Sequence, residues 1–171
     1  QHGTFQHTVD FQVWNHWTLE QDMTPPVTKG WFGEVDFLQT ERRSAGWAYA
    51  TDNSEHFFGD PERLVRATDT TEYLIWETPQ LIQVTMTLFI RLETDLTKAL
   101  ELAVSSTGDD WRTVAYQAEV DDGEHGWRRA RVTLDFRDEP NLHWFRFVLS
   151  DALPKEAVQI GQVILTGYRT E

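Results

Sequence analysis

From residue 71 onward, apolar and polar residues alternate in one short segment after another. The clearest case is 82–92, which begins with apolar residues at every second position: Ile82, Val84, Met86 and Leu88. A period of two is typical of a β-strand with one buried face, because successive side chains of a strand point to opposite sides. The sequence therefore predicts a strand there, and comparable patterns predict strands at 72–76, 99–105, 111–120, 127–136, 143–150 and 159–169.

Polar clusters separate these segments. Pro79 ends the segment 72–76, since proline has no amide hydrogen to donate to a sheet. Residues 106–110 and 121–126 are rich in glycine and aspartate, which is typical of turns. Strands that follow one another at about ten to fifteen residues, with no comparable stretch of helical period, favour an all-β fold. The predicted architecture is an antiparallel β-sandwich or jelly roll.

The 171 residues are predicted to form one domain, 1–171. Residues 9–17 and 34–38 are weaker candidates for strands, and 18–43 is predicted to be a loop-rich insertion. No internal repeat and no long polar linker divides the chain. Because the chain begins at Gln1, we expect either a mature form or a piece of a longer protein.

Acidic residues outnumber basic ones, with 28 Asp and Glu against 15 Lys and Arg and a formal net charge of −13. Such a chain repels phosphate backbones and anionic lipids, so binding to nucleic acid or to a membrane surface is not expected. No apolar run reaches the roughly 20 residues of a membrane span. The chain has no cysteine, which excludes disulfides and thiolate chemistry.

Tryptophan is over-represented, with eight Trp beside ten Phe and four Tyr. A sugar ring packs its C–H face on a flat indole while its hydroxyls bond to carboxylates, amides and arginine, so aromatic residues in polar loops indicate a sugar site. Arginine also matches the carboxylate of an acidic sugar. The predicted ligand-binding residues are Trp31, Arg43, Trp47, Tyr49, Trp111, Arg112, Trp127 and Arg128.

The alternative for these residues is a structural one. Tryptophans that lie within strand-like segments are predicted to be core, and these are Trp14, Trp17, Trp76 and Trp144. Trp111 and Trp127 begin strands after a turn, so the sequence leaves them open between core and surface. The arginines could equally form salt bridges with some of the 28 acidic residues.

The loop 52–63 carries oxygen ligands of the kind that calcium prefers, with Asp52 and Asp60 as the candidate carboxylates. Asp60 could instead cap a turn or pair with Arg63. The six histidines show no spacing typical of a zinc site, and no pair among the 28 acidic residues is marked out as catalytic. The sequence therefore predicts no catalytic residue.

Three stretches together resemble a known kind of domain. Residues 44–63 contain an aromatic pair, Gly59-Asp60 and an arginine ahead of the Glu-Tyr-Leu segment at 72–74, 102–111 has the pattern of a strand followed by Ser, Gly-Asp and an aromatic residue, and 159–165 is similar to a closing strand. In this combination, residues 44–167 resemble the accessory β-sandwich modules of bacterial polysaccharide-degrading enzymes. The resemblance implies a galactose-binding-like jelly roll, usually non-catalytic, which in some members holds a structural calcium ion near the loop matched by 52–63. The chain departs from this pattern at 18–43.

The leading hypothesis is a non-catalytic carbohydrate-binding module of a secreted, extracellular glycoside hydrolase or polysaccharide lyase. Its expected partners are a polysaccharide and the catalytic domain of the parent enzyme, and the chain is expected to be a monomer. One alternative is a structural or spacer domain that packs on a catalytic domain without binding sugar. Another is a small β-sandwich enzyme, such as a polysaccharide lyase, which would need a base and an arginine together in a groove.

Overall fold

The computed structural model describes residues 2–5, 14–22 and 40–170, which form thirteen strands and two short 3-10 helices. The strands are β1 (His2–Phe5), β2 (Trp14–Asp22), β3 (Arg42–Arg43), β4 (Trp47–Ala50), β5 (Arg63–Arg66), β6 (Glu72–Glu77), β7 (Gln80–Arg91), β8 (Leu100–Ser105), β9 (Arg112–Val114), β10 (Ala118–Asp122), β11 (Trp127–Asp135), β12 (Trp144–Leu149) and β13 (Val158–Thr170). The helices are η2 (Ser54–Phe57) and η3 (Leu96–Lys98).

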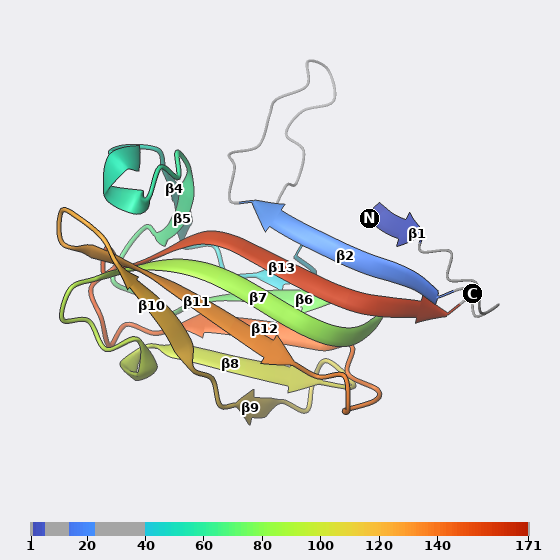
Figure 1. Cartoon of the computed structure of the whole chain (residues 1–171). Coiled ribbons are helices and arrows are strands. Elements are labelled where there is room, and N and C mark those ends of the chain that lie inside the picture. The colour runs from blue at the N-terminus through green and yellow to red at the C-terminus, as the bar shows by residue number, and fades with distance from the viewer. Residues whose placement is uncertain (1, 6–13, 23–39, 171) are drawn as a thin grey trace, which may run out of the picture.

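The strands form two antiparallel sheets that pack face to face (Figure 1). The larger sheet has eight strands, of which six follow the order β1-β2-β13-β7-β11-β10, while β5 pairs with both β13 and β4. The smaller sheet has five strands in the order β3-β6-β12-β8-β9. The prediction of an all-β antiparallel sandwich is confirmed.

The core lies between the two sheets because the period of two places apolar side chains on the inner face of each. Val84, Met86 and Leu88 of β7 are all fully buried. From the smaller sheet, Phe145 of β12 lies opposite Trp76 of β6, with ring centroids 6.0 Å apart. Trp76, which was predicted to be core, is 0% exposed.

One predicted strand is two strands in the structure. The pattern at 111–120 predicts a single strand, but the chain forms β9 in the smaller sheet, crosses over, and forms β10 in the larger one. Val114, Tyr116 and Ala118 all pack against the core through the crossover. The apolar alternation therefore continues without a break, which is why periodicity alone does not show the change of sheet.

Part of the N-terminal prediction lies outside the described residues, namely 9–13, the whole of 34–38, and the stretch 23–39 with Trp31. Both ends of the predicted insertion 18–43 are strands, because β2 pairs with β13 as far as Asp22 and β3 pairs with β6. The predicted loop-rich insertion 18–43 therefore has strand residues at its two ends. Trp14 and Trp17 lie in β2, on a strand as expected.

A short hairpin stands on the larger sheet. β4 and β5 pair antiparallel, with η2 between them, and they lie at the upper left of Figure 1, away from β8, β9 and β12. Phe57 of η2 packs with Phe89 of β7 and Trp127 of β11 in a small cluster separate from the main core. Within the described residues, no helix is long and apolar enough to cross a membrane.

Candidate functional site

The smaller sheet carries aromatic and charged side chains on the side that faces away from the core. Along β12, Phe145 and Phe147 are buried, so the alternating Trp144 and Arg146 point outward. The prediction of Trp144 as core is wrong, because the residue is out of phase with the inward-facing phenylalanines. We call this surface the outer face and define it by Arg42, Tyr73, Ile75, Glu101, Ala103, Trp111, Trp144 and Arg146.

Arg146 lies at the centre of the outer face, between Ile75 of β6 and Ala103 of β8. Its guanidinium carbon is 4.7 Å from the centre of the Trp111 ring. Its Nη2 donates a hydrogen bond to Oε1 of Glu101 at 3.1 Å. Stacking on an indole and pairing with a carboxylate both restrict the guanidinium, which keeps its remaining N–H groups in a defined plane. A half-buried indole, a cation and an anion therefore adjoin one another here.

The turn after β8 positions Trp111. Ser105 Oγ accepts the amide hydrogen of Gly108 at 2.9 Å, which closes the turn, and Gly108 has a φ of +87°. A Cβ at Gly108 would lie 2.7 Å from a ring carbon of Trp144, so only glycine lets the turn rest on that indole. Arg42 of β3 donates to the carbonyl of Gly108 at 2.9 Å, with its guanidinium 5.5 Å from the Trp144 ring.

Tyr73 of β6 is the most exposed aromatic residue of the outer face, at 38%. Val148 of β12 separates it from Glu101 of β8 in the register. The carbonyl of Tyr73 accepts hydrogen bonds from Trp47 Nε1 at 3.1 Å and from Ser44, which ties its backbone down while its ring stays accessible. An accessible phenol ring and the Trp111 indole thus stand on either side of the Arg146–Glu101 pair.

The loop 52–63 on the larger sheet is built around a buried arginine. Arg63 is 0% exposed, and its guanidinium lies 3.6 Å above the Phe57 ring. It donates to the carbonyls of Asp52 and Asp60 at 2.7 and 2.9 Å, to the Asp52 carboxylate at 3.1 Å, and to Gln159 at 2.8 Å. Burial lowers the pKa of Arg63, and the charges of Asp52 and Asp60 oppose that effect.

These contacts bear on the predicted calcium site. Calcium binds six to eight oxygens, but the oxygens that Asp52 and Asp60 turn toward the loop centre already accept hydrogen bonds from Arg63. Asp60 Oδ1 in addition accepts from the amide of Glu62 at 3.0 Å. Among the described residues, no group of three or more His, Asp or Glu side chains is arranged to hold a metal ion. In the structure, these oxygens of Asp52 and Asp60 therefore serve as acceptors for a guanidinium, and calcium binding in the loop stays a prediction.

Trp127 lies under the same loop. It is only 7% exposed, packs against Phe57 with ring centroids 4.7 Å apart, and has the guanidinium of Arg91 5.5 Å from its ring. Of the two roles that the sequence left open for Trp127, the structure therefore shows the buried one. Its neighbour Arg128 donates to the carbonyl of Thr94 at 2.9 Å, which fixes the chain before η3.

A small cleft of about 290 Å³ opens between η2 and the β10–β11 turn. The rings of His56 and His125 stack across it with centroids 4.1 Å apart. Its aromatic residue, Phe58, is 38% exposed, but Arg129 lies 4.5 Å from its ring and Phe89 stacks on it as well. Because two neighbours already occupy this ring, the cleft offers a sugar less apolar surface than the outer face does.

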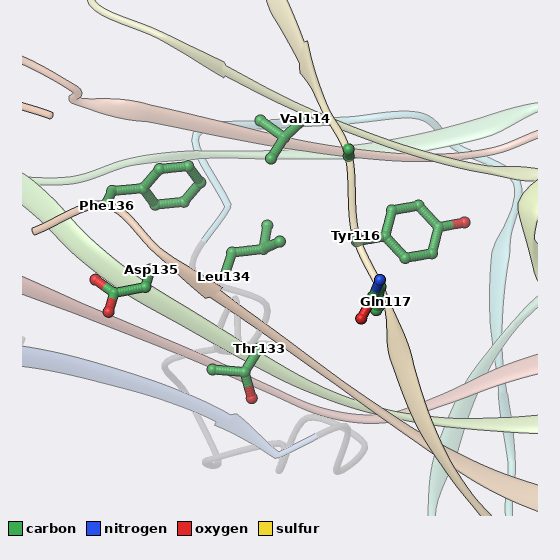
Figure 2. A pocket seen from close by; sticks show the side chains of 8 residues that line it. Val114, Tyr116, Gln117, Thr133, Leu134, Asp135 and Phe136 are labelled. Carbon is green, nitrogen blue, oxygen red and sulfur yellow. The ribbon is translucent and has the colours of Figure 1, made fainter. Parts of the chain in front are cut away.

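A larger groove of about 510 Å³ lies where the chain crosses from β9 to β10. In Figure 2, Val114, Leu134 and Phe136 gather in the space between the crossover and β11. Tyr116 beside them donates its hydroxyl to the carbonyl of Leu100 at 2.9 Å, and burial raises its pKa to about 12. Phe136 is buried, and the Tyr116 hydroxyl is held by its hydrogen bond. This groove therefore presents no freely exposed aromatic ring to a sugar.

The remaining predicted residues are dispersed. Trp47 and Tyr49 on β4 pack against the core. Arg43 donates to Thr40 Oγ1 at 3.3 Å, and Arg112 pairs with Glu139 at 2.8 Å. Of the predicted ligand-binding residues that the structure describes, Trp111 alone lies on the outer face.

Sequence reasoning missed Arg146, Glu101 and Tyr73 as site residues. Each lies within a strand and is followed by a buried apolar residue, so the alternation itself was the available signal. In the sequence, the outward-facing residues of a strand look like ordinary solvent-exposed surface. Only the register shows that several such residues lie side by side.

Comparison with known proteins gives a distant structural neighbour. Among fifteen similar chains of known structure is a family 32 carbohydrate-binding module from a family 31 glycoside hydrolase of Clostridium perfringens. It is 14% identical, with a TM-score of 0.36 over 74% of this chain and 97% of that chain. No protein-family model and no curated protein matches the chain.

Proposed function

We propose that this chain is a non-catalytic carbohydrate-binding module, and that it binds a polysaccharide across the outer face. The observation that carries the proposal is the grouping of Tyr73 and Trp111 on either side of the Arg146–Glu101 ion pair. A sugar ring needs an apolar plane for its C–H face and charged or amide groups for its hydroxyls. The described part of the chain brings these together most openly here.

The shape of the surface supports a polymer as ligand. The outer face is a sheet surface five strands wide, which at about 4.8 Å between strands extends for roughly 19 Å. A surface of this kind can contact several consecutive sugar rings, each through a modest interaction. Such a module would serve a secreted polysaccharide-degrading enzyme by keeping the catalytic domain at high local concentration near its substrate.

The test compares two aromatic residues of equal exposure on opposite sheets. Tyr73 and Phe58 are both 38% exposed. We expect Tyr73→Ala and Trp111→Ala to weaken binding to a polysaccharide about fivefold in calorimetry or affinity electrophoresis, because one stacking contact contributes roughly 1 kcal/mol. Phe58→Ala is the matched control and should bind like the parent chain.

The outcomes separate the possible roles of this domain. Loss of binding in Phe58→Ala with full binding in Tyr73→Ala would move the site to the cleft beside His56. Failure to bind any member of a broad panel of plant, algal and bacterial polysaccharides would overturn the proposed function and favour a spacer domain.

A further inference from the structure

Two arginines flank Ile75 on the outer face. Arg42 of β3 and Arg146 of β12 are both register partners of Ile75, on its two sides. Their Cα positions are therefore about 10 Å apart, which is two strand spacings. Ile75 is only 6% exposed although it points away from the core, so neighbouring side chains cover it. In the row Arg42, Ile75, Arg146, two arginine side chains therefore leave the sheet from the strands on either side of a covered isoleucine.

Both guanidinium groups are positioned by tryptophans. Arg42 lies 5.5 Å from the Trp144 ring and Arg146 lies 4.7 Å from the Trp111 ring. Arg42 donates one N–H to the carbonyl of Gly108. Within the described residues, no carboxylate lies at ion-pair distance from Arg42. A guanidinium has five N–H groups in a planar fork, so donors remain on both arginines after these contacts.

We propose that this row selects acidic polysaccharides, with the carboxylate of a uronic acid residue bound by the guanidinium groups of Arg42 and Arg146 beside Trp144 and Trp111. The inference rests on the proposed glycan-binding function and adds the ligand's chemical class. The planar fork of arginine matches a carboxylate with two parallel hydrogen bonds, and Tyr73 next to Ile75 on β6 offers a ring to the neighbouring sugar.

The net charge of the chain does not prevent this. The formal charge of −13 is spread over the whole sequence, and at physiological salt charges more than about 8 Å away are largely screened. Glu101 neutralises Arg146 through its single ion pair, whereas the charge of Arg42 is balanced by no described carboxylate at that distance. Arg42 therefore brings to the outer face a positive charge that forms no ion pair with a described carboxylate.

The experiment uses polymers that differ only in charge. Polygalacturonate and polymannuronate are compared with the same polymers after their carboxylates have been reduced to neutral alcohols. We expect the parent chain to bind at least one uronate polymer about tenfold more tightly than its reduced form, and to lose affinity as salt is raised. Arg42→Gln and Arg146→Gln should remove that preference, with melting temperatures recorded to show that the variants are folded.

Arg131→Gln is the matched control, because Arg131 is an exposed arginine on the opposite sheet. Equal affinity for charged and reduced polymers, or binding of neutral polysaccharides alone, would overturn the acidic preference and leave the proposed function standing. If a uronate preference persists in both arginine variants, the row is not its source. Absence of binding to every polysaccharide would overturn the proposed function itself.

Discussion

Two regions of this molecule place an arginine over an aromatic ring, one buried and one at the surface. Under the loop 52–63, Arg63 lies 3.6 Å above Phe57 and is 0% exposed. On the outer face, Arg146 lies 4.7 Å from Trp111, and its side chain is 25% exposed. An arginine thus meets an aromatic ring in both places, and the two pairs differ in their exposure to solvent.

The difference lies in what covers each pair. Arg63 is enclosed because β4, η2 and β5 fold over one end of the larger sheet, and its hydrogen bonds to Asp52, Asp60 and Gln159 hold this loop closed. No described helix or strand crosses the outer face of the smaller sheet. A buried arginine–aromatic pair stabilises the fold, whereas an exposed one can exchange its contacts for a ligand.

The largest expected effect comes from the tryptophans. Trp127→Ala should lower the free energy of unfolding by about 3 kcal/mol or more, because it empties a packed cluster with Phe57 and Phe89. Trp111→Ala should lower it by only about 1 kcal/mol, since its indole is half-buried and its ring contact is one guanidinium. Urea unfolding followed by circular dichroism measures both. Similar losses in the two variants would mean that Trp111 is a core residue, as Trp127 is.

The arginines provide the next contrast. Arg63→Ala leaves the acceptors on Asp52, Asp60 and Gln159 without their donor inside a closed loop, which should cost about 3 kcal/mol of stability. Arg146→Ala removes a partly exposed ion pair with Glu101 and should cost about 1 kcal/mol or less. The same unfolding measurement applies. If Arg146→Ala were the more damaging change, the outer face would be part of the structural core.

How far the sequence predicts these two regions depends on what each one needs. Period-two alternation around Val84 and Phe145 is sufficient for the sandwich, because facing sheets require apolar residues on one side of each strand. Trp127 and Trp111 both follow a polar turn, and nothing local distinguishes them. Their burial is decided by whether a distant loop, 52–63, folds over them. That is a tertiary property, so the pattern of residues along one strand does not contain it.

The outer face was hidden from sequence reasoning for a related reason. Arg42, Tyr73, Glu101 and Arg146 are far apart along the chain and meet only through the pairing of β3, β6, β12 and β8. Strand order in a sandwich is not readable from the periodicity of single strands. Arg43 and Trp111 were predicted to bind ligand, but nothing in the sequence indicates that Arg42, the neighbour of Arg43, and Trp111 belong to one surface.

Glycine substitutions sharpen the account of how Trp111 is positioned. Gly108 and Gly126 have φ values of +87° and +85°, but a Cβ at Gly108 would strike Trp144, whereas at Gly126 it would meet nothing within 4 Å. Gly126→Ala should therefore cost about 1 kcal/mol from the backbone alone, and Gly108→Ala about 2 kcal/mol. Only Gly108→Ala should also weaken polysaccharide binding. Equal stabilities measured by urea unfolding would show that the turn does not depend on the Trp144 contact.

The smallest effect is expected from adding a chelator. This experiment tests the buried region around Arg63. A calcium ion at Asp52 and Asp60 would compete with Arg63 for the same oxygens and would lie next to its positive charge, so the guanidinium and the ion exclude each other. We therefore expect a chelator to leave the melting temperature of the parent chain unchanged. Arg63→Met is a second variant for the same measurement, because it removes the guanidinium from those oxygens without adding a charge. A chelator that lowers the melting temperature of the parent chain by several degrees would show that a metal contributes to its stability, and loss of that shift in Asp52→Asn would place the metal in this loop. The loop would then be closed by an ion, and the contrast between a structural arginine and a ligand-facing one would no longer hold.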